Sequence, residues 1–192
     1  MLFKIIAAVD KNNGIGVLNG IPWSFKKDFR HFQESTKNKT TPKKRTAIIM
    51  GRKTMESLPK LYLPDRDNIV ISLSENIESI QEKIRIRTNT KPNKPVRDIY
   101  CFKDCLSAFI FCKTKNYETV WIIGGSQIYQ YFINQPYINE LSITQIQGEF
   151  VCDKYFPNIP KNFQLTNQRK FLDTDRMTNT EYELHINTYL KS

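Results

Sequence analysis

The sequence predicts an α/β fold: a single domain with a central, mostly parallel twisted sheet, flanked by helices, with an antiparallel edge near the C-terminus. Three observations indicate this. Short apolar runs alternate with helical segments up to about residue 133, strand-like segments then follow one another without helices between them, and no repeat or linker divides residues 1–192. A chain of 192 residues is long enough to bury a core of its own.

The first apolar run, residues 3–9, is typical of a strand that is covered on both faces. A long glycine-rich loop follows at 10–23. Ser24 is expected to cap a helix that runs to about Lys37, because a serine hydroxyl can accept from a free N–H group of the first turn. The polar, basic residues 38–45 then indicate a surface loop.

The rest of the parallel sheet is built from further strand and helix units. We assign a strand at 46–50 with a short helix ending near Pro59, a strand at 68–72, a strand at 99–102 with a helix at 104–113, and a strand at 119–123 with a helix at 126–133. Residues 75–97 are charged and contain proline, and their sequence assigns no element to them. The segments 139–147, 163–172 and 180–190 are expected to be antiparallel strands.

The net charge of +10 is compatible with three interpretations. These are a lysine-rich solvated surface, a nucleic-acid-binding module, and a surface that attracts a polyanionic small molecule. No basic motif with interleaved aromatic residues supports specific binding to nucleic acid. No apolar run reaches the roughly 18 residues that a membrane span needs.

The cysteines and histidines argue against both disulfides and a metal site. No pair among Cys101, Cys105, Cys112 and Cys152 has the C-x-x-C spacing, and the N-terminal segment is typical of an interior strand rather than an export signal. We therefore expect reduced thiols and a cytoplasmic protein. His31 and His185 are far apart, which argues against zinc. His31 is expected to lie on the surface, opposite the aromatic face of its helix.

Candidate site residues are sought where parallel strands end, because ligands of open α/β sheets bind there. Phe25, Phe29 and Phe32 follow the spacing i, i+4, i+7 and are expected to share one apolar helix face, which Asp28 borders. Asp28 has two interpretations. It is either an exposed carboxylate or a carboxylate in an apolar pocket that holds an amidine-like edge, such as that of a pterin, through two hydrogen bonds.

Two strand-to-helix turns, Gly51–Thr54 and Gly124–Gln127, each place small residues at a helix start. Helix starts offer free N–H groups to phosphates, and two of them on neighbouring strands suit the pyrophosphate of a dinucleotide. The glycine-rich loop Gly14–Gly20 lacks the G-x-G-x-x-G pattern. By itself it indicates either a surface loop or a backbone that approaches a ligand closely.

Over nearly its whole length the chain resembles the dihydrofolate reductase family. The motifs that match in order are Ala7-Ala8-Val9, Gly14-Ile15-Gly16, Ile21-Pro22-Trp23, Asp28-Phe29-Arg30-His31-Phe32, Ile49-Met50-Gly51-Arg52-Lys53-Thr54, Asn68-Ile69-Val70-Ile71-Ser72, Trp121-Ile122-Ile123-Gly124-Gly125-Ser126-Gln127-Ile128-Tyr129, Thr144 and Asp153-Lys154-Tyr155-Phe156-Pro157. The resemblance implies NADPH-dependent reduction of dihydrofolate to tetrahydrofolate, with hydride transfer to C6 and protonation at N5. It also implies a role in one-carbon metabolism and thymidylate synthesis, binding of antifolates such as methotrexate, and a monomer.

On the substrate side, the resemblance assigns Asp28 as the acid that binds the pterin and supports protonation at N5. Trp23 would order a water molecule near the pterin, and Thr144 would hydrogen-bond the acid. Arg66 would pair with the α-carboxylate of the folate glutamate, which suits a bidentate guanidinium. The walls of the substrate pocket would be Ile6, Ala8, Phe29, Phe32, Ser57, Leu58, Ile123 and Tyr129.

On the cofactor side, the resemblance assigns Ala8, Ile15, Gly16, Gly20, Gly51, Arg52, Lys53, Thr54, Ser72, Leu73, Ser74, Lys103, Ile123, Gly124, Gly125, Ser126, Gln127, Ile128 and Tyr129. It also implies a cis peptide between Gly124 and Gly125 and a mobile catalytic loop at Gly14–Gly20. The chain departs from the family at Leu73, where an arginine often holds the 2′-phosphate of NADPH. We expect Arg52 and Lys103 to compensate, and NADPH to be preferred over NADH.

A related reductase of riboflavin synthesis shares this fold but acts on a pyrimidine. Pro22-Trp23, with Asp28 on the next helix, argues against that alternative. The remaining alternative is a basic nucleic-acid-binding module. The net charge permits it, but such a module does not require glycine turns after apolar strands. A salt titration of an electrophoretic mobility shift would separate it from an enzyme.

Overall fold

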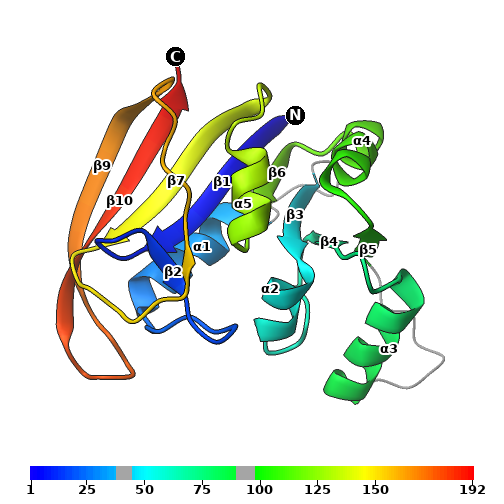
Figure 1. The fold of residues 1–192 in the computed structure, drawn as a ribbon, viewed down its shortest axis with the longest axis horizontal. Helices are drawn as coiled ribbons and strands as arrows, with labels where there is room; N and C mark the ends of the chain where they lie inside the picture. The colour runs from blue at the N-terminus through cyan, green and yellow to red at the C-terminus, as the bar shows by residue number, and fades with distance from the viewer. Residues whose placement is uncertain (38–44, 90–97) are drawn as a thin grey trace.

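The computed structural model describes residues 1–37, 45–89 and 98–192 (Figure 1). The strands are β1 (Leu2–Val9), β2 (Gly14–Gly16), β3 (Thr46–Gly51), β4 (Asp67–Ile71), β5 (Ile99–Phe102), β6 (Thr119–Ile122), β7 (Ile138–Ile146), β8 (Lys154–Tyr155), β9 (Phe163–Thr174) and β10 (Glu181–Lys191). The helices are α1 (Lys26–Thr36), α2 (Arg52–Ser57), α3 (Ile77–Thr88), α4 (Cys105–Lys115) and α5 (Ser126–Phe132).

Eight strands form one twisted sheet in the order β5-β4-β3-β6-β1-β7-β10-β9. Figure 1 shows this sheet extending from β9 at one end of the molecule to β5 at the other. Among the described strands of this sheet, β10 alone runs antiparallel to both of its neighbours. The predicted fold class, a mostly parallel sheet with an antiparallel C-terminal edge and flanking helices, is confirmed.

The antiparallel direction predicted for the segment 139–147 holds on one side only, where β7 pairs antiparallel with β10. On the other side, β7 runs parallel to β1, and Ala8 pairs with Thr144. The reason is that α5 precedes β7 and returns the chain to the edge of the sheet where β1 begins. A parallel pair needs a crossover connection of this kind.

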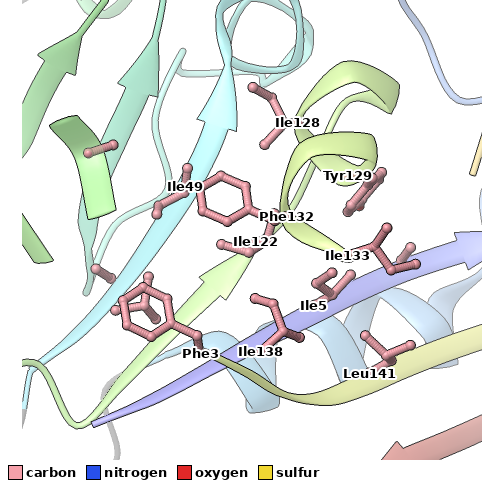
Figure 2. Close-up of a cluster of buried hydrophobic side chains, with 14 of the residues drawn as sticks. Phe3, Ile5, Ile49, Ile122, Ile128, Tyr129, Phe132, Ile133, Ile138 and Leu141 are labelled. Carbon is pink, nitrogen blue, oxygen red and sulfur yellow. The ribbon is translucent and has the colours of Figure 1, made fainter. Parts of the chain in front are cut away.

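Helices cover both faces of the sheet, and alternate residues of each strand point to one face or the other. On one face, α4 and α5 pack over the strands, and Figure 2 shows Phe132 of α5 and the following Ile133 lying close to Ile5 and Ile122. On the other face, buried side chains of α2 and α3 pack against Ile48 of β3 and its neighbours. The central strands are therefore covered on both sides, as their continuous apolar sequences predict.

The start of α1 differs from the prediction. Its N-cap residue is Phe25, not Ser24, and no side chain of the cap accepts a hydrogen bond from the helix. Ser24 is held instead through its backbone, because its N–H donates to Asp175 Oδ1 at 2.8 Å. The free N–H of Lys27 donates to Asp173 Oδ2 at 2.6 Å. Acceptors from β9 and the residue that follows it therefore replace the expected local cap.

Part of the unassigned segment 75–97 is helical, since it contains α3, which Asn76 caps by accepting from the N–H of Ser79 at 2.9 Å. Residues 90–97 lie outside the described residues, as do 38–44 of the predicted surface loop. The glycine-rich loop contains a short strand, β2, which pairs with β8.

The carboxylate of Asp10 anchors the beginning of the glycine-rich loop. Its side chain is buried and accepts from the N–H groups of Asn12, Gly14 and Phe150. The opposite end is a tight turn, in which Val17 and Gly20 exchange backbone hydrogen bonds of 3.0 and 2.8 Å. The loop is therefore fixed at its base and projects an exposed tip.

The four cysteines are free, in agreement with the expected reduced thiols. Within the described part of the chain, no group of histidine, cysteine and acidic side chains is arranged to hold a metal ion. None of the helices there has the length and apolar character needed to cross a membrane.

Candidate active site

A cavity of about 790 Å³ opens where the central parallel strands end. It extends from the glycine-rich loop and the first turn of α1 to the residues that follow β4 and β5. The predicted site residues that line it are Ala8, Ile15, Gly16, Gly20, Trp23, Asp28, Gly51, Arg52, Lys53, Thr54, Ser57, Ser72, Leu73, Ser74, Lys103, Ile123, Gly125, Ser126, Gln127, Ile128 and Tyr129. Segments far apart in the sequence thus meet at one edge of the sheet.

Asp28 is the partly buried acid of this cavity, in the first turn of α1. Burial raises the pKa of its carboxyl from an ordinary 3.8 to about 6, a hydrogen bond with Thr144 opposes this rise, and the nearby negative charge of Asp173 adds to it. Thr144 lies buried on β7, at the position that pairs with Ala8. A carboxyl with this pKa changes its protonation state close to neutral pH.

Two buried aromatic residues line the same cavity as the acid. Trp23 is 5% exposed, lines the cavity and packs edge-on against Phe150 with ring centroids 4.9 Å apart. The hydroxyl of Tyr129 donates to the carbonyl of Ile6 at 2.8 Å, which fixes the ring at the cavity floor. Gly124, with φ +99°, lies beneath this ring, and a Cβ there would come within 2.6 Å of it. Only glycine fits this position without displacing the ring.

The other end of the cavity is lined with cations. Arg52 donates to Glu56 at 2.7 Å, one helical turn away. The ammonium group of Lys103 donates to the carbonyl oxygens of Leu73 and Glu75, both at 3.0 Å. Lys53 is exposed at the start of α2 and forms no ion pair with any described residue. Positive charge therefore accumulates beside the ends of β3 and β5.

Apolar residues line the same end. Leu73 is 85% exposed and Leu106 is 55% exposed, and both line the cavity. The lining residues that sequence reasoning missed are Val17, Asn19, Ile21, Ile71, Asp104, Cys105, Leu106, Tyr131 and Lys154. Ile71 and Asp104–Leu106 could have been found by the strand-end rule, because they end β4 or follow β5. Lys154 belongs to the motif Asp153–Pro157 that resembles the family, and Tyr131 carries no local signal.

Seven predicted residues do not line the cavity: Ile6, Phe29, Phe32, Leu58, Arg66, Gly124 and Thr144. The shared apolar face predicted for the three phenylalanines of the first helix is wrong. Phe25 precedes the helix and packs edge-on against Tyr182, while Phe29 is 58% exposed and Phe32 packs against the core beneath α2 and α3. The three rings therefore have different surroundings: one packs against the C-terminal strands, one is exposed to solvent and one joins the core.

His31 is not a surface residue as predicted. Its Nε2 lies 2.9 Å from the Ser142 hydroxyl of β7, and the side chain is partly buried. Burial lowers the pKa of the imidazole, and the nearby Arg169 lowers it further. The residue therefore helps to pack α1 against the sheet.

Comparison with known proteins agrees with this architecture. The family profile of dihydrofolate reductase matches residues 2–191. The chain belongs to the dihydrofolate reductase family. It is 33% identical over 169 residues to the dihydrofolate reductase of Heliothis virescens, which covers 87% of this chain and 85% of that protein. The enzyme of Drosophila melanogaster is 32% identical over 164 residues, covering 84% and 82%, and that of Mus musculus is 32% identical over 160 residues, covering 80% and 78%.

Family membership makes the protein an oxidoreductase that reduces dihydrofolate to tetrahydrofolate with a nicotinamide cofactor. The residues present fit such a cofactor. The cavity combines three cations with apolar walls at one end, and the peptide between Gly124 and Gly125, which is cis as predicted, borders it. A Cβ at Gly125 would meet the Thr54 hydroxyl at 3.4 Å, so the starts of α2 and α5 lie close together at this peptide.

Arg66 lies apart from the cavity lining. It is 4% exposed, and its Nε donates to the Pro64 carbonyl at 2.9 Å, while Nη1 donates to the Thr36 hydroxyl at the end of α1. It forms no ion pair with an acidic side chain of the described residues, and burial lowers the pKa of its guanidinium. A buried cation without a paired carboxylate is suited to receive one from a ligand.

Proposed function

We propose that this enzyme uses NADPH and that Asp28 is the group that binds and helps to protonate the substrate. The observation that carries the proposal is the position of Asp28: a partly buried carboxyl with a pKa raised to about 6, at the floor of a cavity and hydrogen-bonded to Thr144. An acid is most useful when its pKa lies near the working pH, and burial brings Asp28 there.

The chain's own residues orient the substrate and move one proton. As a carboxylate, Asp28 accepts two hydrogen bonds from the amino edge of the pterin. In its protonated form, which a pKa of about 6 makes accessible, Asp28 would pass its proton to N5 through a water molecule held near Trp23. Thr144 keeps the carboxyl facing the cavity. The nicotinamide cofactor supplies the hydride when bound. The apolar side chains of Trp23 and Ile123, which line the cavity, would hold the two reacting rings close together.

The cations at the other end of the cavity support the choice of NADPH. Arg52, Lys53 and Thr54 are suited to the pyrophosphate, and Lys103 with Arg52 is suited to the 2′-phosphate, since Leu73 offers no charge there. Lys103 is already held above the end of β4 by two carbonyl groups. A positioned cation needs less ordering when the phosphate arrives.

The proposal has further parts. We propose that residues 1–192 act as one domain and as a monomer in the cytoplasm, and that the tip of the Gly14–Gly20 loop closes over the cofactor. Antifolates such as methotrexate would occupy the pterin end against Asp28. Arg66 would hold the glutamate α-carboxylate, and Ile6, Phe29, Phe32 and Leu58 would contact the part of the substrate beyond the pterin.

The test is NADPH oxidation followed by absorbance after dihydrofolate is added, with methotrexate as the blocking control and NADH as the alternative cofactor. Rapid, methotrexate-sensitive turnover with kcat/KM clearly higher for NADPH is expected. A ratio near one, or in favour of NADH, would overturn the assignment of Lys103 and Arg52 to the 2′-phosphate. Absence of turnover by folded protein would overturn the site as proposed.

A further inference from the structure

The end of β9 lies against the start of α1, the helix that carries Asp28. The N–H of Lys27 donates to Asp173 Oδ2 at 2.6 Å, and the ammonium of Lys27 donates to the Leu172 carbonyl at 2.8 Å. Phe25, at the N-cap, supplies no side-chain acceptor. Asp173 therefore provides, from a strand about 145 residues away, the acceptor that a capping residue normally gives its own helix.

A second carboxylate, Asp175, fastens the residues before the helix but differs from Asp173. It is completely buried and accepts from the N–H groups of Ser24 and Met177 and from the Thr178 hydroxyl. These bonds hold the turn after β9 together and hold it against Ser24. Asp173 is partly exposed and lies beside the residue that precedes Asp28, so its charge is the one that reaches the acid.

Few charged groups face Asp28. Thr144 of β7 is its hydrogen-bond partner, and the hydroxyl of Tyr129 on α5 is close enough for the Asp28 charge to raise the pKa of that hydroxyl. On α1 itself, the Lys27 ammonium is engaged by Leu172. Within the described part of the chain, Asp173 is the one formal charge that shifts the pKa of Asp28, and it shifts it upward.

Cations on neighbouring elements act elsewhere. Arg169 of β9 lowers the pKa of His31 rather than that of Asp28. Arg52, Lys53, Lys103 and Lys154 line the cavity on α2, after β5 and on β8, and none of them shifts the pKa of Asp28. The environment of the acid on the β9 side is therefore set by one negative charge.

We propose that Asp173 is a positioning residue for Asp28: it caps the helical turn that carries the acid and keeps a negative charge beside it. This inference rests on the proposed role of Asp28. A neighbouring negative charge favours the protonated state of the carboxyl, and it equally favours a proton on N5 of the bound substrate. Asp173 thereby extends to higher pH the range over which either the Asp28 carboxyl or N5 of the substrate is protonated.

The test compares the pH dependence of hydride transfer, measured in single turnovers with NADPH and dihydrofolate, in the wild type and three variants. Asp173→Asn keeps an oxygen acceptor for the Lys27 N–H but removes the charge. The apparent pKa of hydride transfer should be lower in this variant. The rate at pH 8–9 should therefore drop about two- to fivefold, while the rate at low pH is unchanged. Asp173→Glu, which restores the charge, should return the profile to that of the wild type.

Glu82→Gln is the matched control, because it removes one exposed charge from α3, at the end of the sheet opposite β9 (Figure 1). It should leave the profile unchanged. An equal shift in Glu82→Gln, or an unshifted profile in folded Asp173→Asn, overturns the proposal. If Asp173→Asn does not fold, a measurement on the wild type at high salt takes its place. Salt at 1 M screens an exposed charge and should lower the apparent pKa of hydride transfer. Insensitivity to salt then counts against the proposal.

Asp28→Asn, measured in parallel, separates the two levels of inference. If Asp28→Asn is inactive and Asp173→Asn keeps the wild-type profile, the proposed role of Asp28 is retained and the positioning role of Asp173 is rejected. If Asp28→Asn turns over at the wild-type rate, the proposed role of Asp28 fails, and the inference about Asp173 fails with it.

Discussion

The two ends of the cavity recognise charge in opposite ways. At the pterin end, Asp28 is partly buried among aromatic residues, and its burial changes its pKa. At the cofactor end, Lys53 and Lys103 are exposed to solvent. In the proposed function, the first arrangement would control where a proton lies, while the second would attract phosphates and leave their charge in contact with water. A group that transfers a proton thus needs more desolvation than a group that only binds a phosphate.

The largest effect is expected from a substitution of the acid at the pterin end. Asp28→Asn should lower the hydride-transfer rate at neutral pH by about 10²- to 10⁴-fold, because an amide cannot supply the proton. Single-turnover kinetics measure this, with circular dichroism to show that the fold is intact. Near-wild-type rates in the variant would remove Asp28 from the mechanism.

The next effect concerns the tail of the substrate. Arg66→Ala should weaken dihydrofolate binding by about 1.5–3 kcal/mol, the range for a hydrogen bond to a charged group. Titration calorimetry or fluorescence measures the Kd. A dihydropterin without the glutamate should bind both proteins equally, and Lys60→Ala, which removes an exposed lysine nearby in sequence, should change little. Equal losses for both ligands would show that Arg66 acts only through folding.

A smaller effect is expected on the preference for NADPH over NADH, which depends on the cofactor end. Lys103→Ala should lower the ratio of kcat/KM for NADPH over NADH by about fivefold, and Leu73→Arg should raise it by a similar factor, since each changes one exposed charge near the 2′-phosphate. Lys113→Ala on α4 is the control, because it removes an exposed lysine outside the cavity lining. A ratio unchanged in both variants would place the 2′-phosphate elsewhere.

The smallest effect is on stability and again separates the two ends. The pKa of Asp28 is about 6 in the folded protein, against an ordinary 3.8, so the folded state binds more protons between these values. The wild type therefore loses stability relative to Asp28→Asn as pH rises from about 4 to 7. The difference in Tm, variant minus wild type, should grow by a few degrees over that interval. Lys103→Ala should show no such trend.

Much of the site could be predicted from the sequence because its residues follow buried strands, and strand ends meet at one edge. Asp28 stood out through its aromatic neighbours, and Leu73 through its departure from the family pattern. The helix α3 was missed because charged residues between Ile80 and Ile84 weaken the apolar pattern. The parallel pairing of β7 with β1 was missed because it depends on the crossover made by α5 rather than on the residues of β7 itself.

Contacts across long stretches of sequence could not be predicted. Asp173 and Asp175 reach the start of α1 from 146 and 151 residues away. Nothing near Ser24 or Asp173 in the sequence indicates the partner. His31 was placed on the surface for the same reason, since its Ser142 partner lies on a distant strand. Such contacts become visible only when the sheet order is known.

The position of β1 in the sheet has a consequence for synthesis on the ribosome. The first strand of the chain lies near the centre, and its partners are Thr119–Ile122 on one side and Ile138–Gln145 on the other. Until more than a hundred further residues have emerged, the apolar segment Leu2–Val9 lacks both of its strand partners in the sheet. A nascent chain of this protein therefore carries an unpaired, aggregation-prone strand for most of its translation, and binding by a ribosome-associated chaperone would protect it during that period.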